Sequence, residues 1–301
     1  MPVYGATSRA IVLAVAVVMA TAGCGLQTQA GAGAVKVTVT KDFGARQVSS
    51  ATVADVPTGA SAVAVLQRRF SVKVGPRGTV RAIGGVAASG ASARWALYLN
   101  GIPVGPRTRV HGGDRLWWDL EDASARPRAV VGSFPEPFLH GLGGKRYPTT
   151  LECADDVQAA CRHVAATLGR AGVAVSSQLL GTGSGQDSLT IVVGTWRDIR
   201  PEVAAALIAR GPGSSGVFAR FLRGRSPALQ LLDKRGVPVH RLRPSAGLVA
   251  ALTQGGAPPT WLLVGTDVAG VSAAARALGA KTLRDDVALA VSGAHDLPLP
   301  R

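Results

Sequence analysis

The sequence predicts an α+β protein with two folded parts, and three observations support this prediction. Residues 35–124 contain several short strand patterns and only one helical pattern. Residues 151–301 interleave strand and helix patterns, which favours a layered α/β domain with a mixed sheet. The chain has 301 residues, of which 47% are hydrophobic, so both parts are long enough to bury a core of their own.

The N-terminal segment has the pattern of an export signal. Arg9 supplies a positive charge, Ala10–Met19 forms an apolar stretch, and Ala22–Gly23 offers small residues for cleavage. Cys24 follows directly, and a thiol at the first mature position can carry a lipid. We therefore expect residues 1–23 to be a lipoprotein signal peptide.

The cysteine also predicts where the mature protein lies. The segment resembles a bacterial lipoprotein lipobox, although Thr21 stands where Leu is usual. An uncleaved membrane helix is the alternative, but Ala10–Gly23 is shorter than the ~20 residues that span a bilayer. Residues 24–34 are small and polar, which suits a flexible tether. The expected location is the extracytoplasmic face of the cell membrane, with Cys24 as the lipid anchor.

The first elements of the N-terminal part follow from local patterns. Val35–Thr40 alternates Val with Lys and Thr, as in a half-buried strand. Thr58 is expected to cap a helix over Gly59–Phe70, whose apolar residues fall on one face. Ser71–Val74 and Thr79–Ile83 are expected to be strands joined by a Gly-Pro turn.

A hairpin comes next. Arg94–Leu99 alternates large apolar residues and ends at Asn100-Gly101, a strong signal for a tight turn because both turn positions need positive φ. Ile102 begins the return strand. Arg115–Leu120 is a further strand that carries a double Trp.

The N-terminal part resembles a known family. The matching segments are the opening strand followed by Asp42–Gly44, then Ile83–Val86, Trp95–Gly101 (WALYLNG) and Gly113–Asp122 (GDRLWWDLED). They resemble the DUF4430 family, a β-grasp-like domain also found at the C-terminus of transcobalamin and intrinsic factor. The resemblance covers residues 35–124 and implies a β-grasp-like fold and a corrinoid ligand. The chain lacks the large helical barrel that supplies the other half of such a ligand site, so a separate partner protein would have to provide it.

The remainder of the chain is expected to hold a crossing segment and an α/β domain of unknown role. Residues 125–150 form the crossing, in which Ala129–His140 carries two prolines and is expected to be ordered. Residues 151–301 form the second domain. Its expected elements are helices over Asp155–Leu168, Arg200–Arg210 (with Pro201 in the first turn) and Val268–Leu278, strands over Asp187–Val193, Thr260–Gly265 and Val287–Val291, and a hairpin of Ala228–Leu232 and Val237–Leu242.

Two further cysteines lie in a compartment that tolerates disulfides. Cys153 and Cys161 are eight residues apart, which within one helix would separate their Cα atoms by ~12 Å, beyond the ~7 Å limit for a bridge. Asp155 and Gln158 form a plausible capping box, which would leave Cys153 in the approaching loop. We favour a disulfide between them, with two free buried thiols as the alternative.

The formal net charge is +15, but its distribution argues against a nucleic-acid partner. The basic residues are mostly Arg and are scattered along the chain instead of being gathered in a stripe or tail. This charge also suits a protein held beside an anionic membrane leaflet.

No catalytic, cofactor or metal motif stands out. Gly181–Gly185 and Gly211–Gly216 lack a P-loop or dinucleotide pattern and are expected to be turns. The five histidines show no metal-ligand spacing, and the serines lack a nucleophile-elbow context. Asp119, Glu121 and Asp122 are expected to form a solvated strand edge. We therefore expect a protein that is not an enzyme.

The candidate binding residues are aromatic and polar. Tyr98 and Trp117 point away from the face that carries the other large residues of their strands, and Asn100 and Asp119 accompany them. Two interpretations stay open: these residues contact a ligand or partner, or the second domain packs over them. The first hypothesis for function is a membrane-anchored binding protein for a small ligand or for a transporter of an uptake system. The second is a cell-envelope interaction module with no small-molecule ligand.

Overall fold

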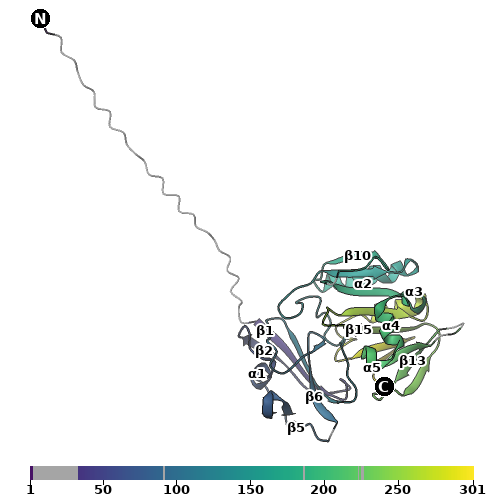
Figure 1. Ribbon diagram of the computed structural model, residues 1–301, viewed down its shortest axis with the longest axis horizontal. Coiled ribbons are helices and arrows are strands. Elements are labelled where there is room, and N and C mark those ends of the chain that lie inside the picture. Colours follow the sequence, from purple (N-terminus) through teal and green to yellow (C-terminus); the bar gives the residue numbers. More distant parts are fainter. Residues whose placement is uncertain (3–32, 91, 186, 223, 225–226) are drawn as a thin grey trace. The chain divides into compact units, whose positions relative to one another are not determined.

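The N-terminal part is built around a five-stranded sheet. The computed structural model describes residues 1–2 and 33–301, except 91, 186, 223 and 225–226, so the predictions for the signal peptide, Cys24 and most of the tether lie outside the described residues. The sheet order is β2-β1-β8-β6-β7, in which β1 and β8 run parallel and the other pairs are antiparallel (Figure 1). The strands are β1 (Gly33–Lys41), β2 (Arg46–Val56), β6 (Ala93–Leu99), β7 (Ile102–Pro103) and β8 (Arg115–Asp122).

One helix covers one face of this sheet. α1 (Ala62–Gln67) contributes Val65 and Leu66 to a core that also contains Trp118 from the sheet. The helix is shorter than expected, and its cap is Ser61, not Thr58: the Ser61 hydroxyl accepts a hydrogen bond from the Ala64 amide at 3.3 Å. A small sheet of β3 (Val72–Val74), β4 (Val80–Ile83) and β5 (Val86–Ala87) completes this part, with the 3₁₀ turn η1 (Pro76–Gly78) between its first two strands.

The crossing segment is ordered and largely buried, as the sequence predicted. Val130 donates to the Gly101 carbonyl at 2.8 Å, and Val131 and Gly132 donate to the backbone carbonyls of Val287 and Asp286. The segment therefore bonds to the hairpin turn of the first part and to the start of the last strands of the second.

The C-terminal part contains a mixed sheet of seven strands, which confirms the predicted α+β class. Its order is β10-β9-β11-β16-β15-β17-β18. The first four strands in this order are parallel to one another, and β15, β17 and β18 add in antiparallel fashion. The strands are β9 (Thr149–Cys153), β10 (Val175–Leu179), β11 (Leu189–Thr195), β15 (Ala246–Leu252), β16 (Thr260–Gly265), β17 (Ala288–Ser292) and β18 (His295–Leu299).

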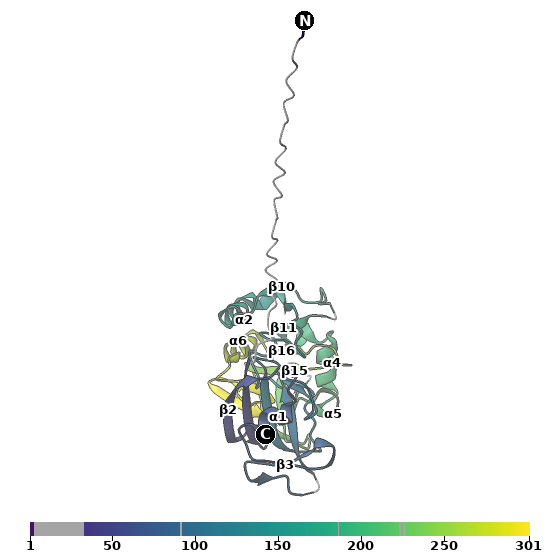
Figure 2. The ribbon, with the colours of Figure 1, turned by 90° about the vertical axis from the view of Figure 1, so that its left-hand side faces the viewer.

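Two different layers cover the faces of this sheet. α2 (Gln158–Arg170), preceded by the 3₁₀ turn η2 (Asp155–Val157), and α6 (Val268–Ala277) pack on one face. The short helices α3 (Trp196–Ile199), α4 (Val203–Ala209) and α5 (Pro212–Ser215) pack on the other, together with a three-stranded sheet of β12 (Ala219–Leu222), β13 (Ala228–Leu232) and β14 (Pro238–Leu242). Figure 2 shows α2 and α6 on one side of the central strands and α4 and α5 on the other. Strand residues alternate between the two cores, because successive side chains of a strand point to opposite faces.

The structure corrects three element predictions in this part. The helix expected over Arg200–Arg210 is α4, but it begins at Val203, so Pro201 precedes it and does not lie in its first turn. The strand near Val287 is not the last one, since β18 follows it. The predicted hairpin of β13 and β14 forms, but in the smaller sheet and not in the mixed one.

Cys153 and Cys161 form a disulfide, as favoured from their spacing. Their Cα atoms are 6.2 Å apart. Cys153 lies outside the helix as required, but it ends β9 and is not in a loop. The expected capping box is absent: Ala154 is the N-cap of η2, and the Gln158 side chain donates to the Ala154 carbonyl at 3.3 Å.

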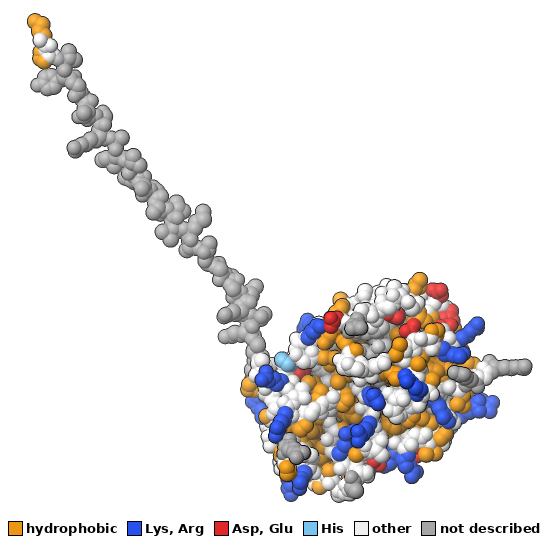
Figure 3. All heavy atoms as spheres, viewed as in Figure 1, with side chains coloured by type: hydrophobic (Ala, Val, Ile, Leu, Met, Phe, Trp, Pro, Cys, Tyr) orange, Lys and Arg blue, Asp and Glu red, His pale blue; other side chains and the backbone are white. Residues whose placement is uncertain are grey.

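Of the helices in the described part of the chain, none has the length and apolar character needed to cross a bilayer. In the view of Figure 3, Lys and Arg side chains are dispersed over the protein surface.

Candidate functional site

The four residues that the sequence singled out for binding are buried. The exposed fractions of Tyr98, Asn100, Trp117 and Asp119 are 3% or less. The Tyr98 and Trp117 rings lie against each other with centroids 5.1 Å apart, in the same core as Phe218 of the second part. Of the two open interpretations, the structure thus shows the packing one. The expectation of an open aromatic binding face is corrected, because the second part covers that face.

Asp119 organises the turn between β1 and β2. Its carboxylate accepts hydrogen bonds from the Thr40 hydroxyl at 2.5 Å, the Phe43 amide at 2.9 Å and the Gly44 amide at 3.1 Å. The Trp117 indole donates to the same Thr40 hydroxyl at 2.6 Å. Burial raises the pKa of Asp119, and these hydrogen bonds oppose that rise.

The turn that Asp119 holds joins the two parts of the protein. Phe43 has a φ of 59°, and its ring centroid lies 6.1 Å from that of Phe218. Gly44 has a φ of 86°, and a Cβ at this position would collide with the Asp285 carbonyl oxygen. Asp119 therefore has a structural role in docking the two parts.

Glu121 is a second buried carboxylate at this junction. It accepts from the Tyr98 hydroxyl at 2.8 Å and pairs with the Arg94 guanidinium at 2.5 Å. Burial raises its pKa to about 7, against the opposing effect of Tyr98 and Arg94. The expected solvated edge is wrong for Asp119 and Glu121, because β8 lies in the middle of its sheet, between β1 and β6.

Asn100 holds the crossing segment in place. It has a φ of 51°, as expected at the hairpin turn. Its side-chain amide donates to the Asp114 carboxylate and to the Gly141 carbonyl, both at 2.8 Å, and its carbonyl accepts from the Arg115 amide at 2.8 Å. All of its polar atoms are thus used within the protein.

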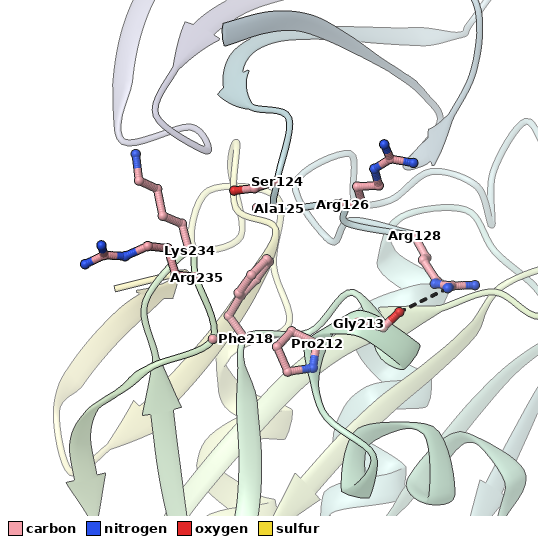
Figure 4. A pocket seen from close by; sticks show the side chains of 10 residues that line it. Ser124, Ala125, Arg126, Arg128, Pro212, Gly213, Phe218, Lys234 and Arg235 are labelled. Atoms are coloured by element: carbon pink, nitrogen blue, oxygen red, sulfur yellow. Dashed lines mark hydrogen bonds between the residues drawn. The ribbon is translucent and has the colours of Figure 1, made fainter. Parts of the chain in front are cut away.

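A solvent-accessible cleft lies at another place on the junction. It has a volume of about 360 Å³ and is lined by three chain segments that are far apart in the sequence. These are residues 124–128 after β8, residues 212–218 around α5, and residues 234–236 in the turn between β13 and β14. Figure 4 shows Phe218 and Pro212 between Lys234 and Arg235 on one side and Arg126 and Arg128 on the other.

The cleft has a surplus of positive charge. Lys234 lies 3.4 Å from the Asp122 carboxylate and Arg235 lies 3.6 Å from the Asp233 carboxylate, so two of the four cations are paired. Arg128 donates to the Gly213 carbonyl at 3.1 Å (Figure 4), and Arg126 donates to the Ala123 carbonyl at 3.5 Å. Within the described residues, Arg126 and Arg128 have no carboxylate within 4 Å.

The glycine-rich segment in this cleft is a turn, as expected. The amides of Ser214 and Ser215 donate to the Gly211 carbonyl at 3.0 Å, and the Gly216 amide donates to the Pro212 carbonyl at 2.8 Å. These amides are already bonded within the segment, so they do not form a phosphate cradle. The positive side chains, not the backbone, give the cleft its charge.

Sequence reasoning missed this cleft. Its charged residues occur in two short segments about a hundred residues apart, Arg126–Arg128 and Lys234–Arg235, and neither forms a motif. The available signals were weak ones: the Arg126-Pro127-Arg128 triplet after a strand and the Asp233–Gly236 turn. Only the packing of the two parts brings these segments together.

Comparisons with known proteins add no assignment. A scan against models of protein families matches none of them, and a search of curated proteins finds no relative. Among the described residues, no group of three or more His, Cys, Asp and Glu side chains is placed to hold a metal ion.

Proposed function

We propose that this protein is a lipid-anchored extracytoplasmic binding protein whose cleft between Arg128 and Lys234 takes a small anionic ligand. The lipid anchor is inferred from Cys24 and the apolar stretch before it. The single observation that carries the ligand proposal is the cleft itself, in which Arg126 and Arg128 lack carboxylate partners.

The lining of the cleft suggests the chemistry of its ligand. Phe218 and Pro212 offer apolar contact, and cations lie on both sides of them (Figure 4). Such a site favours a compact organic body with negative groups at its ends, such as a dicarboxylate or a phosphorylated metabolite. The volume of about 360 Å³ lies at the small end of the ~300–1,000 Å³ range of ligand sites.

The corrinoid implied by the resemblance to DUF4430 is one further candidate ligand of the protein. The β-grasp-like face on which we expected it is covered by the second part, as the burial of Tyr98 and Trp117 indicates. A cleft of about 360 Å³ is too small to enclose a corrinoid, so a corrinoid would need a partner protein, and a transporter or helical-barrel protein stays the proposed partner.

A second candidate function is binding of a protein partner by strand addition. β14 is an edge strand of the three-stranded sheet. Val239 on this strand and Val237 just before it are half exposed. An exposed edge with apolar side chains can pair with an extended segment of another chain. Val239→Lys should abolish capture of such a partner from membrane extracts and leave small-ligand binding unchanged.

A thermal-shift panel tests the ligand proposal. The purified lipoprotein is screened against dicarboxylates, phosphorylated sugars and cyanocobalamin. We expect at least one anion to raise the melting temperature of the wild-type protein but not of the variant Arg126→Gln/Arg128→Gln. The matched control Arg241→Gln/Arg243→Gln removes two exposed Arg from β14 and the residue after it, which do not line the cleft, and should respond as the wild type does. A panel with no response, or an equal loss in both variants, would contradict the proposal.

The anchor is tested separately. Cys24→Ser should release the protein from the membrane fraction, and the mass of the wild-type protein should match a chain that begins at an acylated Cys24. Retention of Cys24→Ser in the membrane with its first 23 residues intact would contradict the lipid anchor.

A further inference from the structure

A second, smaller cavity lies on the junction where β1 and β8 run side by side. It has a volume of about 230 Å³. It is lined by residues of β1 and β8, of the crossing segment and of the loop after α6: Lys36, Thr38, Arg115, Leu116, Trp117, Gly132, Ser133, Ala280, Lys281, Arg284 and Asp285. None of these residues lines the cleft of Figure 4.

Four cations line this cavity, and the described residues give none of them an ion pair. Lys36, Arg115, Lys281 and Arg284 have no carboxylate within 4 Å among the described residues. Arg115 donates to the Phe134 carbonyl at 3.0 Å. Asp285 also lines the cavity and attracts Lys36, Arg115 and Arg284, but one carboxylate against four cations leaves a surplus of positive charge that a bound anion would offset.

The backbone holds two of these cations at neighbouring positions. Lys36 and Arg115 are partners in the parallel register of β1 and β8. The Lys36 amide donates to the Asp114 carbonyl at 3.1 Å, and the Arg115 amide donates to the Asn100 side chain at 2.8 Å. The pKa of Lys36 is lowered by burial and then by Arg115 and Arg284. The pKa of Arg115 is lowered mainly by burial, against the attraction of Glu136 and Asp285.

Two hydroxyl groups add hydrogen-bonding capacity. The exposed fractions of Ser133 and Thr38 are 3% and 8%, and both residues line the cavity. Their hydroxyls make no hydrogen bond with the residues that the structure describes, and their oxygen atoms are not among its buried unbonded polar atoms, so they stay accessible to a group in the cavity. A bound oxyanion would accept from both hydroxyls and from the cations.

We propose that this cavity, which we name the Lys36 pocket, binds a phosphate group. Four cations match a group that carries up to two negative charges, and two hydroxyls supply directional donors. A carboxylate would use fewer of these donors. Asp285 is the one acidic residue of the lining; burial raises its pKa, and Arg284, Lys36 and Arg115 oppose that rise.

The phosphate has two sources, a soluble phosphomonoester or a lipid headgroup. Lys36 lies three residues after Gly33, where β1 begins, and Cys24 precedes Gly33 by nine residues in the sequence. A chain anchored at Cys24 would bring a headgroup within reach of the pocket, so the lipid source rests on the proposed anchor. The proposal that the pocket binds a phosphate group does not depend on that anchor.

Titration calorimetry on the purified full-length protein tests the Lys36 pocket and separates the two sources. The probes are glycerol 1-phosphate, dihexanoyl phosphatidylglycerol below its micelle concentration, and dihexanoyl phosphatidylcholine as the zwitterionic control. Binding of glycerol 1-phosphate supports a pocket for soluble phosphates. Binding of the phosphatidylglycerol alone supports a headgroup site.

Variants decide whether the binding occurs in this pocket. Lys281→Gln/Arg284→Gln removes two exposed cations and should weaken binding by about 10-fold for each cation. Ser133→Ala should weaken it about 5-fold, since one neutral hydrogen bond is lost. Arg241→Gln/Arg243→Gln removes the same charge from exposed positions outside the pocket and should bind as the wild type does.

Three results would overturn the proposal. They are no binding of either anionic probe, equal weakening by Arg241→Gln/Arg243→Gln, and loss of binding in Arg126→Gln/Arg128→Gln with retention in Lys281→Gln/Arg284→Gln. The last result would place the phosphate in the cleft of Figure 4, so it would support the proposed function while refuting the Lys36 pocket.

Discussion

Glu121→Gln should make the protein more stable at alkaline pH. Glu121 is buried, and burial raises its pKa from the ordinary 4.5 to about 7. Each pKa unit corresponds to about 1.4 kcal/mol, so the ionised form destabilises the fold by about 3 kcal/mol. The pKa of about 7 already includes the effects of the attraction to Arg94 and of the hydrogen bond from Tyr98. Gln keeps an acceptor for the Tyr98 hydroxyl and carries no charge.

The sign of the pH dependence follows from proton binding. Between pH 4.5 and about 7 the folded protein holds a proton on Glu121 that the unfolded chain has released. The free energy of unfolding therefore falls as pH rises, by about 1.4 kcal/mol per pH unit from this group, and levels off above pH 7. The Gln variant lacks this contribution. Its advantage over the wild type should grow from near zero at pH 5 to about 3 kcal/mol at pH 8.

Urea denaturation at several pH values measures this difference. Asp286 also has a pKa raised to about 7, by burial and by Asp285 and Asp296, and it acts with the same sign. Asp286 is present in both proteins, so subtracting the two unfolding free energies isolates Glu121. Curves that stay parallel from pH 5 to pH 8, or a variant that is less stable at pH 8, would refute the reasoning.

Three further predictions concern the stability of the fold. Gly270→Ala should destabilise the protein by about 1–3 kcal/mol, because a Cβ there collides with the Ala246 carbonyl oxygen. Gly169→Ala in α2, where the space is open, should be neutral or stabilising. Urea denaturation of both variants checks these two expectations. Phe43→Ala should destabilise it by about 3–5 kcal/mol through the loss of a buried aromatic ring, and an unfolding midpoint within 0.5 M urea of the wild type would count against a docking role. Under oxidising conditions, Cys153→Ser should have an unfolding free energy roughly 2–3 kcal/mol lower than the wild type, because the disulfide closes a short loop. An unchanged unfolding free energy would show that the bridge does not constrain the unfolded chain.

The sequence predicted several elements with regular apolar patterns and missed others, among them the mostly polar β2 and the fully buried β15. β1, β6, β8, β11, β16 and α6 lie close to their predicted positions because their apolar patterns are regular. β2 was not predicted, since most of its residues are exposed or only partly buried. The N-cap of α1 is Ser61 and not the expected Thr58. Both residue types are good caps, so only packing decides between them. Pro201 was placed in the first turn of a helix, but it separates two helices instead.

The candidate site shows a sharper limit of sequence reasoning. The alternation of β6 and β8 correctly places Tyr98 and Trp117 on the face opposite the first core. It does not show what covers that face, because the covering residues, such as Phe218, come from a different part of the chain. The charged residues of the cleft are separated in the same way, and long-range packing determines which of them meet.

The most direct measurement of the central claim is the affinity of the cleft for the anion that responds best in the thermal-shift panel. Calorimetric titration should give a dissociation constant at least 10-fold weaker for Arg126→Gln/Arg128→Gln than for the wild type, and the wild-type affinity should fall as salt is added. The control Arg241→Gln/Arg243→Gln should match the wild type. An affinity that is independent of Arg126 and Arg128 would contradict the account.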